Sequence, residues 1–160
     1  KEAGAHGVKP EGAQEVKESI IRILTAGVPV MGHLGLTPQS IYKFGTHVVR
    51  AKEVEEAQRL IEDAKMLEEV GCFAIVLEKI PAKLAKVVAE TVKVPVIGIG
   101  AGNGVDGQVL VTHDMLGITA EFSPRFLRRY MNLYEDMQGA VGQYIKDIKT
   151  KDFPNDNEQY

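Results

Sequence analysis

Residues 73–78 read Phe-Ala-Ile-Val-Leu-Glu, an unbroken apolar run that ends in a carboxylate. Such a run is typical of a strand covered on both faces, as in parallel sheets. A helix of about four turns is predicted before it, because apolar residues recur at helical spacing until Gly71. They are Ala57, Leu60, Ile61, Ala64 and Leu67. After the run, Pro81 suits the first turn of another helix, so this part of the chain reads as helix, strand, helix.

The same alternation extends in both directions along the chain. Residues 28–34 and 95–99 are short apolar runs, and a helix predicted around Ile20 precedes the first of them and stops at Gly27. Residues 4–9 would add another strand. Strands that alternate with helices predict an α/β protein with a parallel sheet and right-handed crossovers.

The C-terminal part of the chain allows two interpretations. Residues 109–112 are mostly β-branched, which favours a strand, although the loop before them is short for a parallel crossover. The alternative is a helix that Asp106 caps and that runs to Gly117. Beyond this point we expect a long helix over residues 124–149 and a loose polar tail over residues 150–160.

The composition is that of an ordinary globular domain, with 44% hydrophobic and 26% charged residues. A net charge of −3 gives no sign of the positive charge that nucleic-acid-binding proteins carry. No stretch approaches the roughly 20 apolar residues of a membrane span. The single cysteine, Cys72, allows no internal disulfide and gives no sign of an oxidising compartment. We therefore expect a cytoplasmic domain over residues 1–149, with neither nucleic acid nor membrane as a partner.

Polar residues follow the predicted strands at the same relative place each time. They are Lys9 with Glu11, His33, Glu78, the glycine-rich residues 98–102, and His113 with Asp114. In parallel sheets and barrels, ligands bind at the carboxyl ends of the strands. The recurrence therefore predicts a functional site at that edge, and it does so more strongly than any single residue.

Each of these residues also has a purely structural interpretation. Glu78 suits a general base at the rim of a partly desolvated site, but periodicity alone favours a surface glutamate. Lys9 and Glu11 point the same way in an extended chain, and they would bind an anionic substrate and a metal or form a salt bridge. His33 fits a ligand-binding or a structural histidine equally well. Residues 98–102 fit phosphate binding or close packing.

Residues 32–40 read Gly-His-Leu-Gly-Leu-Thr-Pro-Gln-Ser, and this nonapeptide resembles the signature segment of the ketopantoate hydroxymethyltransferase family. Further segments agree in order and spacing. They are residues 8–12, 77–81, and 95–102 with 106–108. The resemblance covers essentially the whole chain, and it implies a (β/α)8 TIM barrel with about five of the eight strands present in this chain.

The resemblance also implies an activity. Family members move a hydroxymethyl group from 5,10-methylenetetrahydrofolate to α-ketoisovalerate, and the product is ketopantoate, a precursor of pantothenate. Mg²⁺ chelated by the keto acid stabilises the enolate. By the same resemblance, Glu78 is the base that takes a proton from C3, Lys9 binds the substrate and Glu11 belongs to the magnesium site. Three further residues are expected to line the site: His33, Gly98 and Gly100.

Two departures from the family pattern change the expectation. Pro10 stands where many relatives carry an apolar β-branched residue, and its missing N–H is unusual in a central strand, so it marks the strand end or shifts the metal ligand.

Family members also carry residues before this point, among them the aspartates that bind magnesium directly. We therefore expect this chain alone to be inactive, and the full-length protein to be a homo-oligomer. A related Mg²⁺-dependent barrel lyase or aldolase of keto acids, and a non-catalytic half-barrel, are the alternatives.

Overall fold

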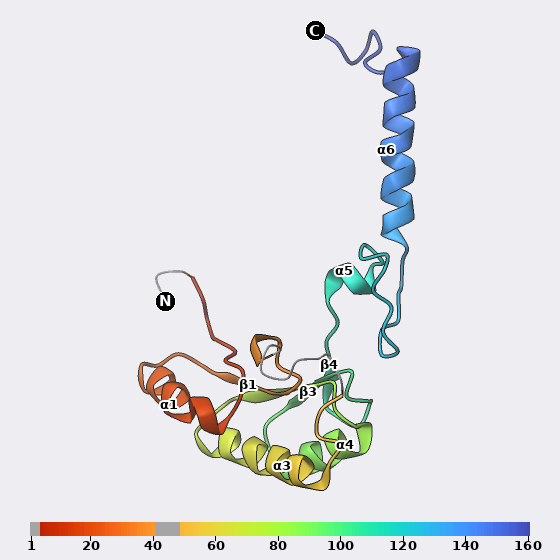
Figure 1. The fold of residues 1–160 in the computed structure, drawn as a ribbon. Coiled ribbons are helices and arrows are strands. Elements are labelled where there is room, and N and C mark those ends of the chain that lie inside the picture. The colour runs from red at the N-terminus through yellow and green to blue at the C-terminus, as the bar shows by residue number, and fades with distance from the viewer. Residues whose placement is uncertain (1–3, 41–48) are drawn as a thin grey trace. The chain divides into compact units, whose positions relative to one another are not determined.

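The computed structural model describes residues 4–40 and 49–160, and it divides into two compact units, Lys1–Val109 and Leu110–Tyr160. The first unit contains a four-stranded parallel sheet whose order along the sheet, β1-β2-β3-β4, is also the order along the chain (Figure 1). Its strands are β1 (Met31–Gly35), β2 (Ala74–Glu78), β3 (Val96–Ile99) and β4 (Gly107–Gln108). The predicted α/β class and parallel sheet are confirmed.

Helices occupy the sequence before β1 and between the following strands. They are η1 (Gln14–Val16), α1 (Lys17–Thr25), η2 (Pro38–Ser40), α3 (Val54–Glu69) and α4 (Ala82–Thr91). α3 packs on β1 and β2 while α4 packs on β3, and Figure 1 shows both helices on the same face of the sheet. The apolar stripe of α3 forms the centre of the core, where Leu67 is fully buried with Ile75 and Leu77 of β2.

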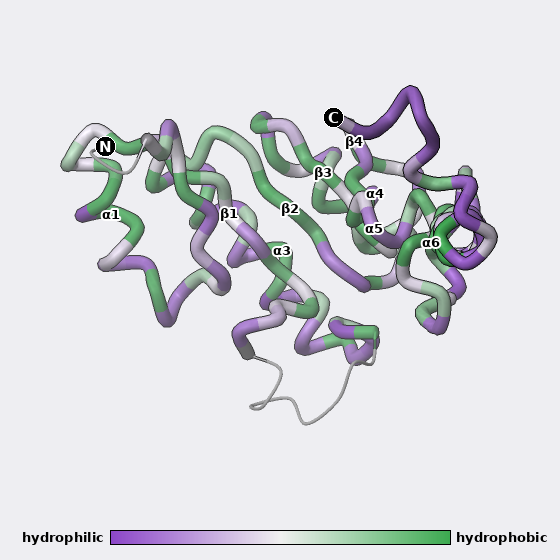
Figure 2. Tube along the Cα trace, turned by 90° about the horizontal axis from the view of Figure 1, so that it is seen from above, coloured by the Kyte–Doolittle hydropathy of each residue, from purple (hydrophilic) through white to green (hydrophobic). Residues whose placement is uncertain are grey.

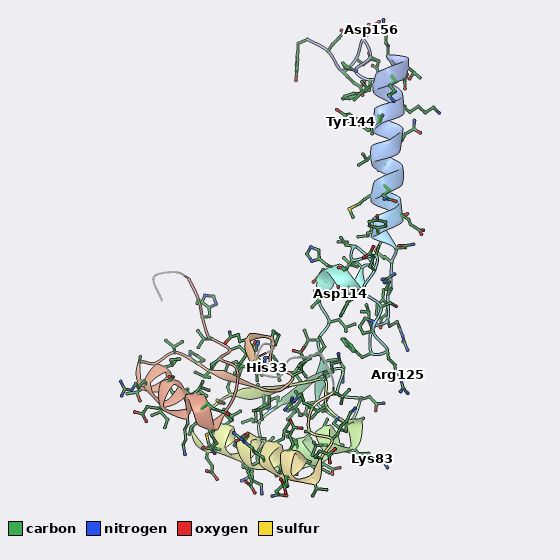
Figure 3. All side chains as sticks on the ribbon, viewed as in Figure 1. His33, Lys83, Asp114, Arg125, Tyr144 and Asp156 are labelled. Atoms are coloured by element: carbon green, nitrogen blue, oxygen red, sulfur yellow. The ribbon has the colours of Figure 1, made fainter. Side chains whose placement is uncertain are left out.

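The two faces of the sheet have different roles because successive side chains on a strand point to opposite sides. On β1, Leu34 belongs to the core, and a Cβ atom on Gly32 would meet Leu67 of α3, so these two residues face the helices. His33 lies between them and points to the other face, where Figure 3 shows it away from α3. Figure 2 shows β2 hydrophobic along most of its length and hydrophilic at its carboxyl end, where Glu78 lies.

The strand expected over residues 109–112 is wrong. The fourth strand, β4, comes earlier, and Thr112 already begins the short helix α5 (Thr112–Met115). Val109 gives one more hydrogen bond to β3, to the carbonyl of Gly98 (3.0 Å), and the chain then leaves the sheet. The β-branched residues predicted a strand, but in the described part of the chain pairing with β3 does not continue past Val109.

The alternative, a helix capped by Asp106, is also wrong. The Asp106 carboxylate accepts a hydrogen bond from the backbone N–H of Val96 (2.8 Å), and the Asp106 N–H donates to the Val96 carbonyl (3.0 Å). These two bonds tie the loop to β3. Residues 4–9 likewise form no full strand in the described part of the chain: Val8 makes one parallel bridge, with Val30.

The second unit contains α5 and the long helix α6 (Leu133–Thr150). α6 begins at Leu133 and not at residue 124, because the preceding residues use their hydrogen-bonding groups elsewhere. The Arg129 guanidinium donates to three backbone carbonyls, those of Thr119, Ala120 and Phe122. The N–H groups of Tyr130, Leu133 and Tyr134 donate to the carbonyls of Met115, Leu116 and Gly117.

The tail folds back on the end of α6. Lys151 adopts the left-handed conformation (φ 62°), and the ring of Phe153 lies 5.6 Å from the ring of Tyr144. α6 and the tail belong to the same compact unit, and the domain boundary expected between residues 149 and 150 stays a prediction. Within residues 4–40 and 49–160, no helix is long and apolar enough to cross a membrane.

Candidate active site

Four side chains from three separate parts of the first unit meet at the carboxyl end of the sheet. Lys9 Nζ lies 2.9 Å from His33 Nδ1, and Glu11 Oε1 lies 3.6 Å from the same nitrogen. On the other side of the ring, Glu78 Oε2 lies 3.2 Å from His33 Nε2. The structure therefore brings together the four side chains that the sequence placed at one edge, with His33 between the others.

The segment that carries Lys9 and Glu11 is held against β1 at both ends. Val8 exchanges backbone hydrogen bonds with Pro29 and Met31, each 3.0 Å long, and the N–H of Gly12 donates to the carbonyl of His33 (3.0 Å). Pro10 lies between these two attachments. Its missing N–H therefore costs no ladder hydrogen bond, which explains why a proline is tolerated at this position.

Glu78 is positioned by the backbone on both sides of it. Its carbonyl accepts a hydrogen bond from Leu36 N (2.9 Å), and the N–H of Lys79 donates to the Ile99 carbonyl (2.8 Å). Lys79 has a positive φ of 51°, a conformation that costs a non-glycine residue energy and that clusters at functional sites. The carboxyl end of β2 is thus fixed by its neighbours β1 and β3.

Burial differs among the four side chains. The side chain of His33 is 3% exposed and that of Glu11 is 8% exposed, whereas that of Glu78 is 25% exposed. Glu11 Oε2 accepts a hydrogen bond from the backbone N–H of Gln39 (2.8 Å), which lies in η2. Glu78 is therefore the more accessible of the two carboxylates, and the buried ring of His33 lies beside it.

The glycines expected to line the site lie on the neighbouring strand and its loop. A Cβ atom on Gly98 would come within 3.3 Å of Val105 and Gln108, which indicates close packing at that position. Gly100 has a φ of 61°, as a tight turn requires. Their role as site-lining residues stays a prediction. His113 and Asp114 belong to the second unit, in α5.

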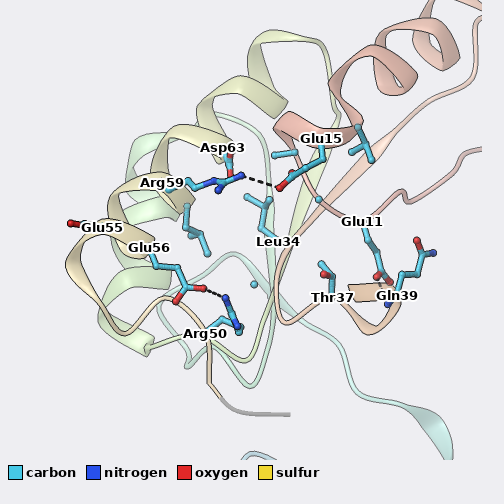
Figure 4. A pocket seen from close by; sticks show the side chains of 15 residues that line it. Glu11, Glu15, Leu34, Thr37, Gln39, Arg50, Glu55, Glu56, Arg59 and Asp63 are labelled. Carbon is cyan, nitrogen blue, oxygen red and sulfur yellow. Dashed lines mark hydrogen bonds and ion pairs between the residues drawn. The ribbon is translucent and has the colours of Figure 1, made fainter. Parts of the chain in front are cut away.

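A cavity of about 730 Å³ opens beside Glu11, between β1, η1 and α3 (Figure 4). Its lining is highly charged and includes residues that the sequence analysis missed, although Arg59 and Asp63 stand at the i, i+4 spacing of a helical ion pair. Arg59 pairs with Glu15 (2.9 Å) and approaches Asp63 (3.7 Å). Lys9, His33 and Glu78 are not among its described lining residues, so the cavity adjoins the four-residue cluster and does not contain it.

Asp63 is a buried carboxyl in the wall of this cavity. Desolvation raises the pKa of Asp63 above its ordinary value, Arg59 opposes this increase, and the negative charges of Glu15 and Glu62 add to it. The described residues bring no three His, Cys, Asp or Glu side chains together in an arrangement that could hold a metal ion. Glu11 therefore belongs to no such group of three within the described residues.

A parallel sheet whose strands follow one another in chain order, with helices on one face and polar side chains at the carboxyl ends of its strands, has the architecture of part of a (β/α)-barrel. The sequence profile of one family with that architecture, ketopantoate hydroxymethyltransferase, matches residues 1–156. The chain belongs to the ketopantoate hydroxymethyltransferase family.

Curated relatives support the same assignment. The chain is 72% identical over 160 residues to a protein of Flavobacterium johnsoniae, 69% identical to one of Christiangramia forsetii and 58% identical to one of Salinibacter ruber. Each of these proteins is named 3-methyl-2-oxobutanoate hydroxymethyltransferase, and each match covers the whole of this chain. The chain spans 59% of the length of the first two relatives and 60% of the third.

Proposed function

We propose that this chain supplies the proton-abstracting base and the substrate-binding lysine of an enzyme that transfers a hydroxymethyl group to α-ketoisovalerate and forms ketopantoate. The observation that supports it is the meeting of Lys9, Glu11, His33 and Glu78 at the carboxyl end of the sheet. The names of the relatives support the same substrate, because 3-methyl-2-oxobutanoate is α-ketoisovalerate.

The chemistry requires a base and a cation close together. Removal of the C3 proton of the keto acid gives an enolate, and this nucleophile then forms a carbon–carbon bond to the one-carbon unit. The bonds from that carbon to the nitrogens of the donor are broken, and water supplies the hydroxyl oxygen of the product. Glu78 suits the base because its carboxylate is partly exposed and its backbone is fixed on both sides. Lys9 uses one N–H on His33 and keeps two others, which are available to the carboxylate of the substrate.

We propose 5,10-methylenetetrahydrofolate as the one-carbon donor and Mg²⁺ as the metal. Such a metal would supply Lewis-acid chemistry that makes the C3 proton of the substrate more acidic. Protein Mg²⁺ sites often use one or two carboxylates together with substrate oxygens and water, and Glu11 would contribute one. Because no group of three side chains among the described residues is arranged to hold a metal ion, we expect the chain in isolation to form no ketopantoate.

Exchange of the C3 hydrogen of α-ketoisovalerate with solvent deuterium, followed by proton NMR with Mg²⁺ and without folate, isolates the proton-transfer step. We would compare the chain alone with a chimera that fuses it to the part of the Flavobacterium johnsoniae relative that the match leaves uncovered. We expect exchange only in the chimera, and Glu78→Gln should slow it by about 10²–10⁴-fold.

Glu90→Gln is the matched control, because Glu90 lies on α4 with its side chain 65% exposed. An undiminished exchange rate in the Glu78→Gln chimera would contradict the assignment of the base. Exchange by the chain alone would show that its own residues suffice without further metal ligands.

The same assay separates the alternatives. A related Mg²⁺-dependent lyase or aldolase would exchange the C3 hydrogen but form no ketopantoate when 5,10-methylenetetrahydrofolate is added. A non-catalytic half-barrel would do neither. The cytoplasmic location and the homo-oligomeric state expected from the sequence stay predictions, and sedimentation of the chimera would measure the second.

A further inference from the structure

We propose that Lys9 fixes the tautomer of His33 and that His33, through its other ring nitrogen, orients the carboxylate of Glu78. His33 is then a positioning residue that links the lysine to the base. The role of Glu78 rests on the proposed function, whereas the tautomer of His33 follows from the geometry of this chain alone.

The contact between Lys9 and His33 determines which ring nitrogen carries the proton. Lys9 Nζ lies 2.9 Å from His33 Nδ1, a hydrogen-bond distance. An ammonium group has donors and no acceptor, so Nδ1 must be the acceptor and carries no proton. A neutral imidazole with a bare Nδ1 has its proton on Nε2. The structure thus assigns the Nε2–H tautomer to His33.

The charges around the ring favour the same tautomer. A proton on Nδ1 would point toward the ammonium of Lys9, and Glu11 could compensate only from 3.6 Å. The other oxygen of Glu11 is already used by the N–H of Gln39 (2.8 Å). On the Nε2 side the charged group is Glu78, at 3.2 Å. The ring is therefore polarised from a cation on one edge to an anion on the other.

Nε2 is the one buried side-chain polar atom without a hydrogen-bond partner in the part of the chain that the structure describes. Glu78 Oε2 lies at an ion-pair distance from Nε2, but the two atoms form no hydrogen bond in this structure. Catalytic hydrogen bonds are often poorly aligned before substrate binds. The ring is fully enclosed, whereas the Glu78 side chain is 25% exposed, so the carboxylate is the partner free to turn.

The orientation of the His33 ring determines the direction from which Nε2 can bind the Glu78 carboxylate. The backbone of His33 is held in the centre of β1 and by Gly12 N, and its side chain is buried, so the imidazole has little room to follow a moving carboxylate. One oxygen of Glu78 is then directed at Nε2–H, and the other is left for the C3 proton of the substrate. This geometry makes Lys9 a determinant of base orientation as well as a substrate-binding cation.

Long-range proton–nitrogen NMR of the uniformly ¹⁵N-labelled chain at neutral pH reads the tautomer directly. The His33 signals are assigned by their loss in His33→Gln. We expect a protonated Nε2 and an unprotonated Nδ1 in the native chain, and a mixture of tautomers in Lys9→Met. Lys83→Met is the control, because Lys83 is exposed on α4 (Figure 3). An Nδ1–H tautomer in the native chain, or no change in Lys9→Met, would overturn the assignment.

Kinetics of the chimera test the second half of the proposal. His33→Asn keeps an acceptor near Nδ1 but removes the group that faces Glu78, so we expect kcat for C3 exchange to fall about tenfold with little change in KM. His33→Gln, which places a donor near Nε2, should recover part of the loss. A raised KM with unchanged kcat would overturn the positioning role and indicate that His33 binds substrate directly. If the native chimera shows no exchange, the proposed function fails, while the tautomer measurement still decides the link between Lys9 and His33.

Discussion

Gly35 and Glu78 meet backbone to backbone: a Cβ atom on Gly35 would overlap the main-chain oxygen of Glu78. The two residues are register partners in the β1–β2 pair, and Gly35 has a φ of +94° that favours glycine. The strand that ends at Gly35 therefore lies against the backbone of the strand that carries Glu78, and only glycine fits this close approach.

Gly35→Ala should be strongly destabilising, because the methyl group collides with the Glu78 carbonyl and the residue is strained as well. Gly71→Ala is the matched control, since Gly71 also has a positive φ (102°) but has only Leu24 Cδ1 nearby, at 3.8 Å. We expect a loss of about 1–2 kcal/mol for the control and about 1–3 kcal/mol more for Gly35→Ala. Urea unfolding measures both, and equal losses would show that the close approach is unimportant.

Asp63→Asn should stabilise the first unit at neutral pH. Burial raises the pKa of Asp63, so the native state holds its proton more tightly than the unfolded state does. The contribution of Asp63 to the free energy of unfolding is then greatest below about pH 3.9, the ordinary pKa of an aspartate. This contribution is lost as the pH rises through the pKa of Asp63 in the folded state. We expect a higher Tm for Asp63→Asn at pH 7 and a difference that shrinks near pH 4. Glu69→Gln, an exposed change on α3, should show no such pH trend.

Cys72 should react slowly with thiol reagents. It is 2% exposed, and burial raises the pKa of its thiol, so little thiolate is present and reagents cannot reach it. We expect a reaction with a disulfide reagent at pH 8 to be at least about tenfold slower in the native chain than in guanidinium chloride. Equal rates would mean that the region around Cys72 opens readily.

Asp106→Ala should weaken the attachment of the loop before β4. The carboxylate accepts the N–H of Val96 at 2.8 Å, and removal of a charged acceptor from a partly buried donor costs about 1.5–3 kcal/mol. Asp106→Asn keeps an acceptor oxygen and should cost less. Denaturant unfolding of the two variants separates them, and no difference from the native chain in either would show that the bond contributes nothing.

Gly139→Ala should stabilise α6. Gly139 lies inside the helix with open space where a methyl group would be, so alanine gains helix propensity without a collision, about 1 kcal/mol. Hydrogen exchange of α6 amides reports the local gain without requiring the two units to unfold together. Slower exchange in the variant is expected, and faster exchange would indicate that α6 needs a glycine for a contact it makes elsewhere.

The sequence predicted the parts of the fold that depend on local periodicity and on burial. The strands β1, β2 and β3 and the helices α1, α3 and α4 were found because each has an apolar pattern bounded by glycine or proline. The start of α6 was not, since residues before Leu133 satisfy their backbone groups through Arg129 and through contacts with residues 115–117, which no local pattern records. The same is true of β4, which follows directly after the Asp106 bonds to Val96, bonds that no local pattern records.

The sequence likewise predicted some features of the candidate site and missed others. The carboxyl ends of the strands predicted that Lys9, His33 and Glu78 lie at one edge, but not that His33 lies between the other two. The central position of His33 depends on the register, in which His33 pairs with Val76, two residues before Glu78 on the same face of β2. The charged cavity beside Glu11 was also missed, because its walls come from η1, β1 and α3, which are distant in sequence.

The strand order has a consequence for how the chain acquires its structure on the ribosome. Each strand of the sheet pairs with the strand made just before it, so every new helix and strand can dock as soon as it emerges from the exit tunnel. No described strand has to wait for a partner that is distant in the sequence. Assembly in the order of translation would leave β2, the strand that carries Glu78, enclosed between β1 and β3 well before α6 is synthesised.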